Sequence, residues 1–271
     1  PAPDEVVVQI AGVGLCHTDI AIQHGHMPFP LPGVVGHEGS GTIVRVGSEV
    51  TTLAVGDRVA MSFTSCGACP RCDMGEPANC HNFLAYNFGG VRPDGTSGLS
   101  AAGAQLGANF FGQSSLATHA LARASDVVKL PPGTPLELVG PLGCGVQTGA
   151  GAVMNSLDVR AGTAIVIAGA GAVGLSAVMA AAVRNAATII AVDLHENRRA
   201  LARELGATHT IDPTAGPLSE QVREIIPAGA DYAVDTTAVT PVVEQLLASL
   251  GMKGALGLIG VPADPEATFS M

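Results

Sequence analysis

Four of the six cysteines lie in one short segment at spacings that suit a metal ion; they are Cys66, Cys69, Cys72 and Cys80. Four thiolates from a single loop provide the closed tetrahedral donor set of a structural zinc ion. Packing alone does not explain them, because small loops do not accumulate four cysteines as buried hydrophobic residues. An iron–sulfur cluster is the alternative, since CxxCxxC spacing also serves such clusters.

A second group of donors is scattered along the chain. Cys16, His37 and Cys144 offer two thiolates and one imidazole, which match a catalytic zinc ion whose fourth position is open to water or substrate. A lone buried cysteine or histidine is more often a packing residue, so each of the three is weak evidence by itself. Spacing does not show that they converge, and their grouping is a hypothesis.

A glycine-rich turn follows a short apolar strand and precedes a helical pattern. Its glycines are Gly169, Gly171 and Gly174, spaced as GxGxxG after residues 164–168. The first permits a tight turn, the second lets the backbone approach a pyrophosphate, and the third allows the helix to pack closely on the strand. The helix N-terminus adds unpaired N–H groups that favour an anion. This context predicts a dinucleotide site of the Rossmann type.

Asp193 ends the next predicted strand, nineteen residues after Gly174. A carboxylate at this place binds the ribose hydroxyls and repels a 2′-phosphate, so we expect NAD. Arg198, which we count among the nucleotide-binding residues, and Arg199 lie nearby in the sequence and leave NADP open. An ordinary tight turn, with Asp193 capping the following helix, is the alternative without a nucleotide.

The two halves of the chain differ in their hydrophobic pattern. Up to about residue 128, short apolar segments alternate with Gly, Pro and Asp, which predicts an irregular, mostly β domain over residues 1–133. A helical connection is expected over residues 134–162. From residue 163 to 271, apolar strands alternate with helical patterns, which predicts the doubly wound parallel sheet of an α/β domain.

The same patterns give the expected elements. Strands of the first domain are expected at residues 6–10, 41–46, 57–60 and 126–130, with long loops over residues 82–112. Strands of the second domain are expected at residues 164–168, 188–192, 208–211, 232–235 and 255–259. Helices are expected at residues 173–185, 196–205, 218–226 and 241–250.

Composition limits the kinds of partner. The 271 residues, 47% of them hydrophobic, suffice for two cores. A net charge of −10 argues against nucleic acid or an anionic membrane, since either partner would call for a basic patch. The longest apolar run, residues 164–183, has a strand–turn–helix pattern and predicts no membrane span. The charge balance therefore favours a small-molecule substrate. Because the N-terminus has no signal pattern, we expect a cytoplasmic protein.

These motifs together resemble the zinc-containing alcohol dehydrogenases of the medium-chain dehydrogenase/reductase superfamily. The segment GHExxGx5GxxV at residues 36–50 is similar to the zinc signature of that family. The four-cysteine loop, the tract around Cys144 and the GxGxxG turn follow in the family's order, so the resemblance covers residues 6–261. The tracts at residues 16–19, 110–115 and 140–151 look most like the aryl-alcohol (benzyl alcohol) dehydrogenase branch.

The resemblance implies a GroES-like catalytic domain followed by a Rossmann domain, with two zinc ions per chain and NAD. It implies oxidation of a primary alcohol to its aldehyde by zinc-assisted hydride transfer, with an aryl alcohol favoured. Aliphatic, allylic or terpenoid alcohols and S-hydroxymethylglutathione are the alternative substrates. It further implies that the full-length protein is a homo-oligomer, either a dimer or a tetramer. By comparison with the family's fold, the 271 residues are expected to be a fragment that lacks both ends.

The resemblance also assigns roles around the catalytic zinc ion. Cys16, His37 and Cys144 are its implied ligands, and Glu38 is a nearby acid that assists ligand exchange. Asp19 is implied to orient a ligand such as His37.

Further roles follow for the proton and the nucleotide. Thr18 is implied to accept the alcohol proton, and His17 to contact the pyrophosphate. Thr148 and Val173 match positions against the nicotinamide. Many members continue the proton relay with a histidine where this chain has Ala21, so the proton must leave by ribose hydroxyls, water or another group.

Two other classes of protein stay open from the residues alone. One is a zinc-free, NADP-linked reductase or a crystallin-like structural relative on the same fold, in which Cys16, His37 and Cys144 would be unnecessary. The other is an iron–sulfur electron-transfer module joined to a Rossmann domain.

Overall fold

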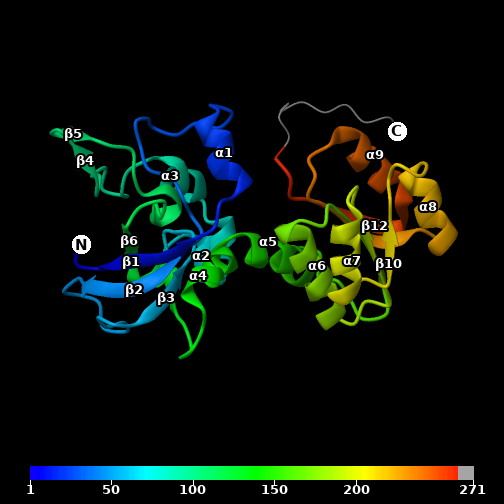
Figure 1. Cartoon of the computed structure of the whole chain (residues 1–271), viewed down its shortest axis with the longest axis horizontal. Coiled ribbons are helices and arrows are strands. Elements are labelled where there is room, and N and C mark those ends of the chain that lie inside the picture. The colour runs from blue at the N-terminus through cyan, green and yellow to red at the C-terminus, as the bar shows by residue number, and fades with distance from the viewer. Residues whose placement is uncertain (262–271) are drawn as a thin grey trace. The chain divides into compact units, whose positions relative to one another are not determined.

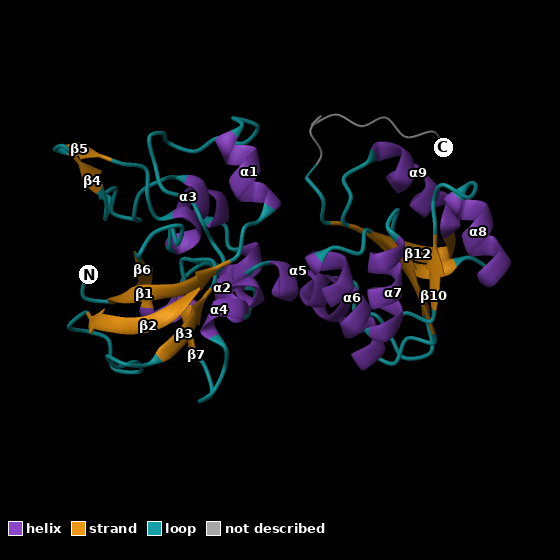
Figure 2. Cartoon of the chain, viewed as in Figure 1, coloured by secondary structure: helices purple, strands orange, loops and turns teal. Residues whose placement is uncertain are grey.

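The computed structural model describes residues 1–261. The chain divides into two compact units, Pro1–Cys144 and Gly145–Met271. Their boundary falls inside the segment predicted as a helical connection. The end of the predicted nucleotide-binding domain, residues 262–271, lies outside the described residues. Figure 1 follows the chain through both units, and Figure 2 distinguishes helices from strands.

The first unit is built around an antiparallel sheet. Its strands are β1 (Glu5–Val13), β2 (Gly39–Val46), β3 (Arg58–Met61), β6 (His119–Arg123) and β7 (Val127–Lys129), in the order β6-β1-β2-β3-β7. Side chains alternate between the two faces of a strand, so Val6 and Val8 of β1 reach the same core as Ile43 and Val59. This core anchors the loops that carry the first unit's polar side chains.

Short helices and turns complete the first unit. They are α1 (His17–Gln23), α2 (Pro70–Asp73), η1 (Pro77–Asn79), α3 (Phe83–Phe88), η2 (Phe110–Gly112), η3 (Ala124–Asp126), α4 (Leu136–Val139) and η4 (Gly140–Gly143), with a small hairpin of β4 (Ser100–Ala101) and β5 (Ala104–Gln105).

The expectation of loops throughout residues 82–112 is wrong in part, because α3 and the β4–β5 hairpin lie there. Helix α3 is fixed by a tertiary contact: the buried Asn87 amide donates to the carbonyls of Thr64 and Phe83 and accepts from the N–H of Thr64. Helix α1 and strand β6 were also not predicted. Their sequences are short, and the strand is rich in alanine, a residue depleted in strands.

The second unit is a parallel sheet covered on both faces. Its strands are β8 (Ala164–Ala168), β9 (Thr188–Val192), β10 (His209–Ile211), β11 (Ala230–Asp235) and β12 (Leu250–Leu258), in the order β10-β9-β8-β11-β12. Its helices are α5 (Gly145–Gly151), the π-helical turn Ala152–Ser156, α6 (Ala172–Val183), α7 (Glu196–Glu204), α8 (Leu218–Ile225) and α9 (Thr240–Ser249).

Two cores sandwich this sheet. Ile165 and Ile167 of β8 face one core with residues of α6 and α7, while Val166 and Ala168 face the other with residues of α8 and α9. The strand order reverses between β8 and β11, which is where parallel sheets of this kind bind ligands at their carboxyl edge. The predicted doubly wound parallel sheet is confirmed. Over residues 1–261, the structure contains no helix with the length and apolar character needed to span a membrane.

Candidate metal and nucleotide sites

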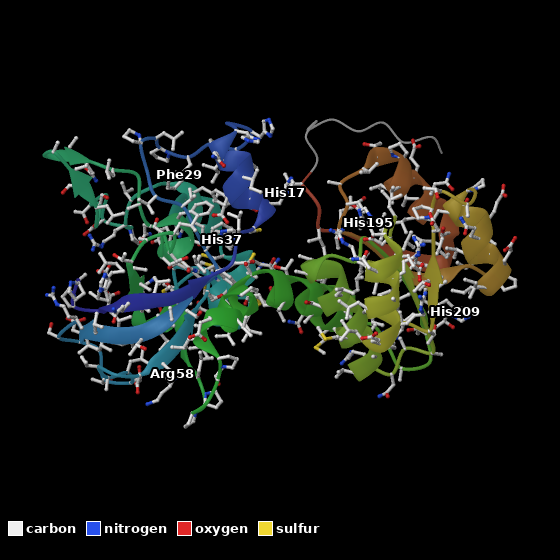
Figure 3. The ribbon with its side chains drawn as sticks, in the orientation of Figure 1. His17, Phe29, His37, Arg58, His195 and His209 are labelled. Carbon is white, nitrogen blue, oxygen red and sulfur yellow. The ribbon has the colours of Figure 1, made fainter. Side chains whose placement is uncertain are left out.

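Donor atoms of Cys16, His37, Glu38 and Cys144 meet at one place in the first unit, where all lie within 4.8 Å of one another. Cys16 precedes α1, His37 and Glu38 precede β2, and Cys144 follows η4. Figure 3 labels His37 in this unit. The structure therefore brings together the scattered donors that the sequence could only group as a hypothesis, and it adds the Glu38 carboxylate.

Asp19, which is 2% exposed, holds two of these donors by hydrogen bonds. One oxygen accepts from the N–H of Cys16 at 3.0 Å. The other accepts from the N–H of Gly36 at 2.8 Å and lies 3.3 Å from Nδ1 of His37. Since Nδ1 is engaged, Nε2 is the nitrogen that can bind a metal, and it has no hydrogen-bond partner among the described residues.

Two close backbone contacts bring Cys144 to this place. A Cβ atom on Gly140 would lie 1.9 Å from the carbonyl oxygen of Glu38, and one on Gly143 would lie 1.9 Å from that of Met61. Only glycine fits at such an approach. The resulting turn leaves the sulfur of Cys144 4.0 Å from that of Cys16, far beyond the length of a disulfide bond.

The electrostatics suit a metal cation. The hydrogen bond from Cys144, with further contacts from His37, holds the pKa of Cys16 far below its ordinary value, while the same bond raises the pKa of Cys144. Burial opposes a charged imidazole, but the hydrogen bond to Asp19 and the contact with Cys16 raise the pKa of His37 to about 9. Thiolate and imidazole donors in a partly buried cluster fit zinc, whose tetrahedral thiolates stand about 3.8 Å apart for Zn–S distances of about 2.3 Å.

Aromatic rings surround the imidazole of His37. Phe111 stacks on it with ring centres 4.5 Å apart, and Phe110 contacts it edge-on at 5.3 Å. Phe83 packs against Phe111, and Phe63 packs against Phe83. Phe110 is fully buried, whereas the other three rings are partly exposed.

The four-cysteine loop also closes around one point. All four sulfur atoms lie within 4.8 Å of one another, with Cys66 and Cys69 at 3.9 and 3.6 Å from Cys72. These separations are near the value of about 3.8 Å that a tetrahedral zinc–thiolate site requires. Hydrogen bonds from the backbone N–H groups of His81 and Cys72 lower the pKa of Cys69 to about 6, which favours the thiolate.

In the second unit, the glycine turn has the form that a dinucleotide requires. Gly169 has φ +88°, and a Cβ atom on Gly174 would lie 1.7 Å from the carbonyl oxygen of Gly169, so the fold itself demands both glycines. A Cβ atom on Gly171 would meet no atom within 4 Å, and its backbone is extended. The free space at Gly171 thus fits the close approach of a bound pyrophosphate.

Asp193 lies beside this turn and is buried. Its two oxygens accept from the N–H groups of Ala170 and His195, each at 2.8 Å, and Arg198 approaches to 3.6 Å. Burial opposes its charge, but these backbone hydrogen bonds lower the pKa of Asp193. The carboxylate therefore tethers the glycine turn to the end of β9.

The other predicted residues lie on helices, two of them in the first unit and two in the second. The exposed His17 begins α1, and Thr18 follows it with its hydroxyl 3.6 Å from the sulfur of Cys16. Thr148 lies on α5 and Val173 on α6, and these helices approach closely, since a Cβ atom on Gly149 would lie 2.0 Å from the carbonyl of Val173.

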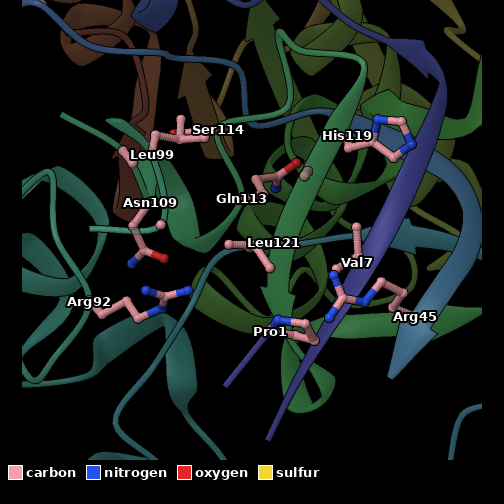
Figure 4. Close-up of a pocket in the computed structure, with 13 residues that line it drawn as sticks. Pro1, Val7, Arg45, Arg92, Leu99, Asn109, Gln113, Ser114, His119 and Leu121 are labelled. Atoms are coloured by element: carbon pink, nitrogen blue, oxygen red, sulfur yellow. The ribbon is translucent and has the colours of Figure 1, made fainter. Parts of the chain in front are cut away.

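Sequence reasoning missed Gln113. Its buried amide accepts from the N–H of Gly39 and donates to the carbonyls of His37 and Ser62. A polar residue inside the tract of residues 110–115 was the only local signal. Gln113 also lines a cavity of about 290 Å³ with Arg92 and His119, shown in Figure 4, but none of the four clustered donors does so.

Comparison with known proteins identifies the family. Residues 2–132 match the alcohol dehydrogenase GroES-like domain, and residues 172–271 match the zinc-binding dehydrogenase family. The chain is 48% identical over 269 residues to geraniol dehydrogenase of Castellaniella defragrans, covering 98% of this chain and 72% of that protein.

Solved structures agree. Benzyl alcohol dehydrogenase from Acinetobacter calcoaceticus has a TM-score of 0.94 and 43% identity, covering 100% of this chain and 74% of that chain. A candidate zinc-binding dehydrogenase from Sinorhizobium meliloti bound to NADP has a TM-score of 0.79 and 27% identity, covering 100% and 73%. The predicted GroES-like and Rossmann folds are confirmed, and the chain belongs to the zinc-dependent alcohol dehydrogenases of the medium-chain family.

Proposed function

We propose that this alcohol dehydrogenase oxidises a primary alcohol carrying an aromatic group to its aldehyde, with NAD as the hydride acceptor. Cys16, His37 and Cys144 hold the catalytic zinc ion, and the four-cysteine loop holds the structural one. When bound, the catalytic zinc ion acts as a Lewis acid that lowers the pKa of the alcohol hydroxyl.

The residues of the chain supply the remaining chemistry. Thr18, whose hydroxyl lies 3.6 Å from the sulfur of Cys16, accepts the alcohol proton. The free space beside Gly171 leaves room for the pyrophosphate of the nucleotide. The resemblance to the family suggests His17 as a further pyrophosphate-binding residue. Thr148 and Val173 contact the nicotinamide, and water or a ribose hydroxyl passes the proton onward, because the family's usual histidine is replaced by Ala21.

One observation carries the choice of an aromatic substrate. Phe111, Phe83 and Phe63 form a chain of contacting, partly exposed rings that begins on the imidazole of His37. A planar ring of the substrate can join such a set by edge or face contacts, each worth about 0.5–1.5 kcal/mol beyond burial of area. A saturated alkyl chain gains only the burial.

The substrate proposal is tested by the ratio of kcat/KM for benzyl alcohol to that for 1-hexanol. Phe83→Leu should lower this ratio about 2- to 12-fold, which is the equivalent of one aromatic contact. Phe29→Leu is the matched control, since Phe29 is also partly exposed but contacts Phe110, whose fully buried ring is not available to a substrate. A parent protein that prefers hexanol, or an unchanged ratio in Phe83→Leu, would contradict the proposal.

An allylic alcohol is the second candidate, because a relative at 48% identity is named geraniol dehydrogenase. Geraniol therefore belongs in the same measurement. A kcat/KM for geraniol above that for benzyl alcohol would favour the allylic substrate.

The choice of NAD rests on Asp193, since its carboxylate repels a 2′-phosphate. Arg198 at 3.6 Å is the nearest counter-charge and works against this discrimination. We expect higher kcat/KM with NAD than with NADP, and Arg198→Ala should widen the difference. Equal use of the two nucleotides by the parent protein would refute the assignment.

A further inference from the structure

The Glu38 carboxylate is buried, with the side chain 6% exposed, and it shares the first unit's donor cluster with two sulfurs and an imidazole. A glutamate has three rotatable bonds, so its carboxylate can occupy many positions. Something other than its own geometry must therefore fix the carboxylate within 4.8 Å of the other donors.

The backbone on either side of Glu38 is held by a single side chain. Gln113, 2% exposed, accepts from the N–H of Gly39 at 3.0 Å and donates to the carbonyl of His37 at 3.0 Å. It also donates to the carbonyl of Ser62 at 3.3 Å. The peptide groups before and after Glu38 are thus tied to one amide.

The loop that presents Gln113 is itself held in a costly conformation. Asn109, Phe111 and Ser114 have φ of 60°, 48° and 50°, a region that residues other than glycine rarely adopt. Ser114 accepts from the N–H of Phe110 and donates to the carbonyl of Val34, which locks the loop onto the segment that leads to His37. Strain of this kind persists where surrounding contacts fix it, often at functional sites.

Room for the carboxylate comes from Gly14. A Cβ atom on Gly14 would lie 1.9 Å from Oε2 of Glu38 and 3.0 Å from Cδ. The φ of Gly14 is outside the left-handed region, so its backbone conformation does not require glycine. The N–H of Gly14 also donates to the carbonyl of Glu38 at 3.0 Å. A methyl group at this position would have to displace the flexible end of Glu38, and it would also lie close to Cβ of Glu38, at 3.1 Å.

We propose that Gly14 and Gln113 are positioning residues that together keep the Glu38 carboxylate in the donor cluster. Gln113 fixes the backbone of Glu38, and Gly14 leaves the volume that its carboxylate fills. This inference rests on the proposed metal site at Cys16, His37 and Cys144.

The test is zinc affinity, measured by chelator competition, together with the visible spectrum of the cobalt-substituted protein. Gly14→Ala should weaken zinc at this site about 10- to 100-fold, as loss of an outer contact does, and should change the cobalt bands. Gly216→Ala is the matched control, because a Cβ atom there meets nothing within 4 Å and its φ is outside the left-handed region. The four-cysteine site should keep its metal in every variant.

A double-mutant cycle distinguishes the carboxylate from general damage. When Glu38 is already Ala, Gly14→Ala should have no further effect on zinc affinity, and Gln113→Met should have a smaller effect than in the parent. Unchanged affinity and spectrum in Gly14→Ala would overturn the inference, as would equal losses in both backgrounds. A parent protein that binds no metal at Cys16 and His37 would instead refute the proposed function.

Discussion

Replacing Asp19 by Ala should destabilise the protein and weaken the first unit's metal site together. The carboxylate accepts from two backbone N–H groups, of Cys16 at 3.0 Å and of Gly36 at 2.8 Å, and it is 2% exposed. Hydrogen bonds to a charged group contribute about 1.5–3 kcal/mol each, so the two bonds amount to about 3–6 kcal/mol. The contact of Asp19 with Nδ1 of His37 is longer, at 3.3 Å, and bears on metal affinity more than on the free energy of unfolding.

A loss of this size is a large part of the stability of a typical domain, which is about 5–15 kcal/mol. Urea unfolding of the metal-free protein isolates it, because bound zinc would add its own stabilisation. Asp19→Asn keeps one carbonyl oxygen and should lose about half as much. The control is Glu49→Ala on the surface, expected to change stability by less than about 0.5 kcal/mol.

Zinc affinity is the second readout for Asp19. Without the bond to Nδ1, the ring of His37 loses its fixed orientation, and affinity should fall about 10- to 100-fold. The reasoning would be refuted if Asp19→Ala unfolded at the same urea concentration as the parent, since the buried N–H groups would then have been satisfied without it. Unchanged zinc affinity would refute only the claim that Asp19 positions His37 for the metal, and would leave the stability prediction standing.

Three further predictions concern other parts of the first unit. Cys69→Ser should remove about one zinc ion per chain and leave the other in place, because each thiolate is needed to close a four-sulfur site; elemental analysis that finds iron and sulfide in the parent would contradict this. Arg92→Ala should lower the free energy of unfolding in urea by about 3–5 kcal/mol, because it leaves Glu5, 3% exposed, without its bidentate ion pair. The double variant Arg92→Met with Glu5→Gln should recover more than half of this stability, and no recovery would show that the unpaired charge is not the cause. Burial raises the pKa of Asp126, so the folded protein binds this proton more tightly than the unfolded chain does, and stability should fall as pH rises from the ordinary carboxyl pKa through the folded pKa, then level off. Measured as Tm from pH 3 to 8, this fall should be missing in Asp126→Asn. A pH profile identical to that of the parent would contradict the prediction.

The sequence predicted the second unit well because its signals are local. Strands β8 and β9 have the bounds that the apolar segments indicated, and the helices that follow them, α6 and α7, agree with the prediction within a few residues. The first unit was harder. Strand β6, with the sequence HALAR, has no marked strand pattern and pairs with β1 over its whole length. Helix α3 is fixed by the hydrogen bonds of Asn87 to Thr64.

What the sequence alone determined are the features written within about twenty residues: the four-cysteine loop, the glycine turn with Asp193, and the alternation of strand and helix. Short-range spacing is enough for these, because turn geometry and periodic burial depend on neighbouring residues. Tertiary structure alone decided that Cys16, His37 and Cys144 meet, although the two cysteines stand 128 positions apart. Tertiary structure also brings Gly14 against the side chain of Glu38, and Gln113 against the peptide groups that flank Glu38. These contacts exist only after the sheet, the loop over residues 109–115 and the turn before Cys144 have packed together.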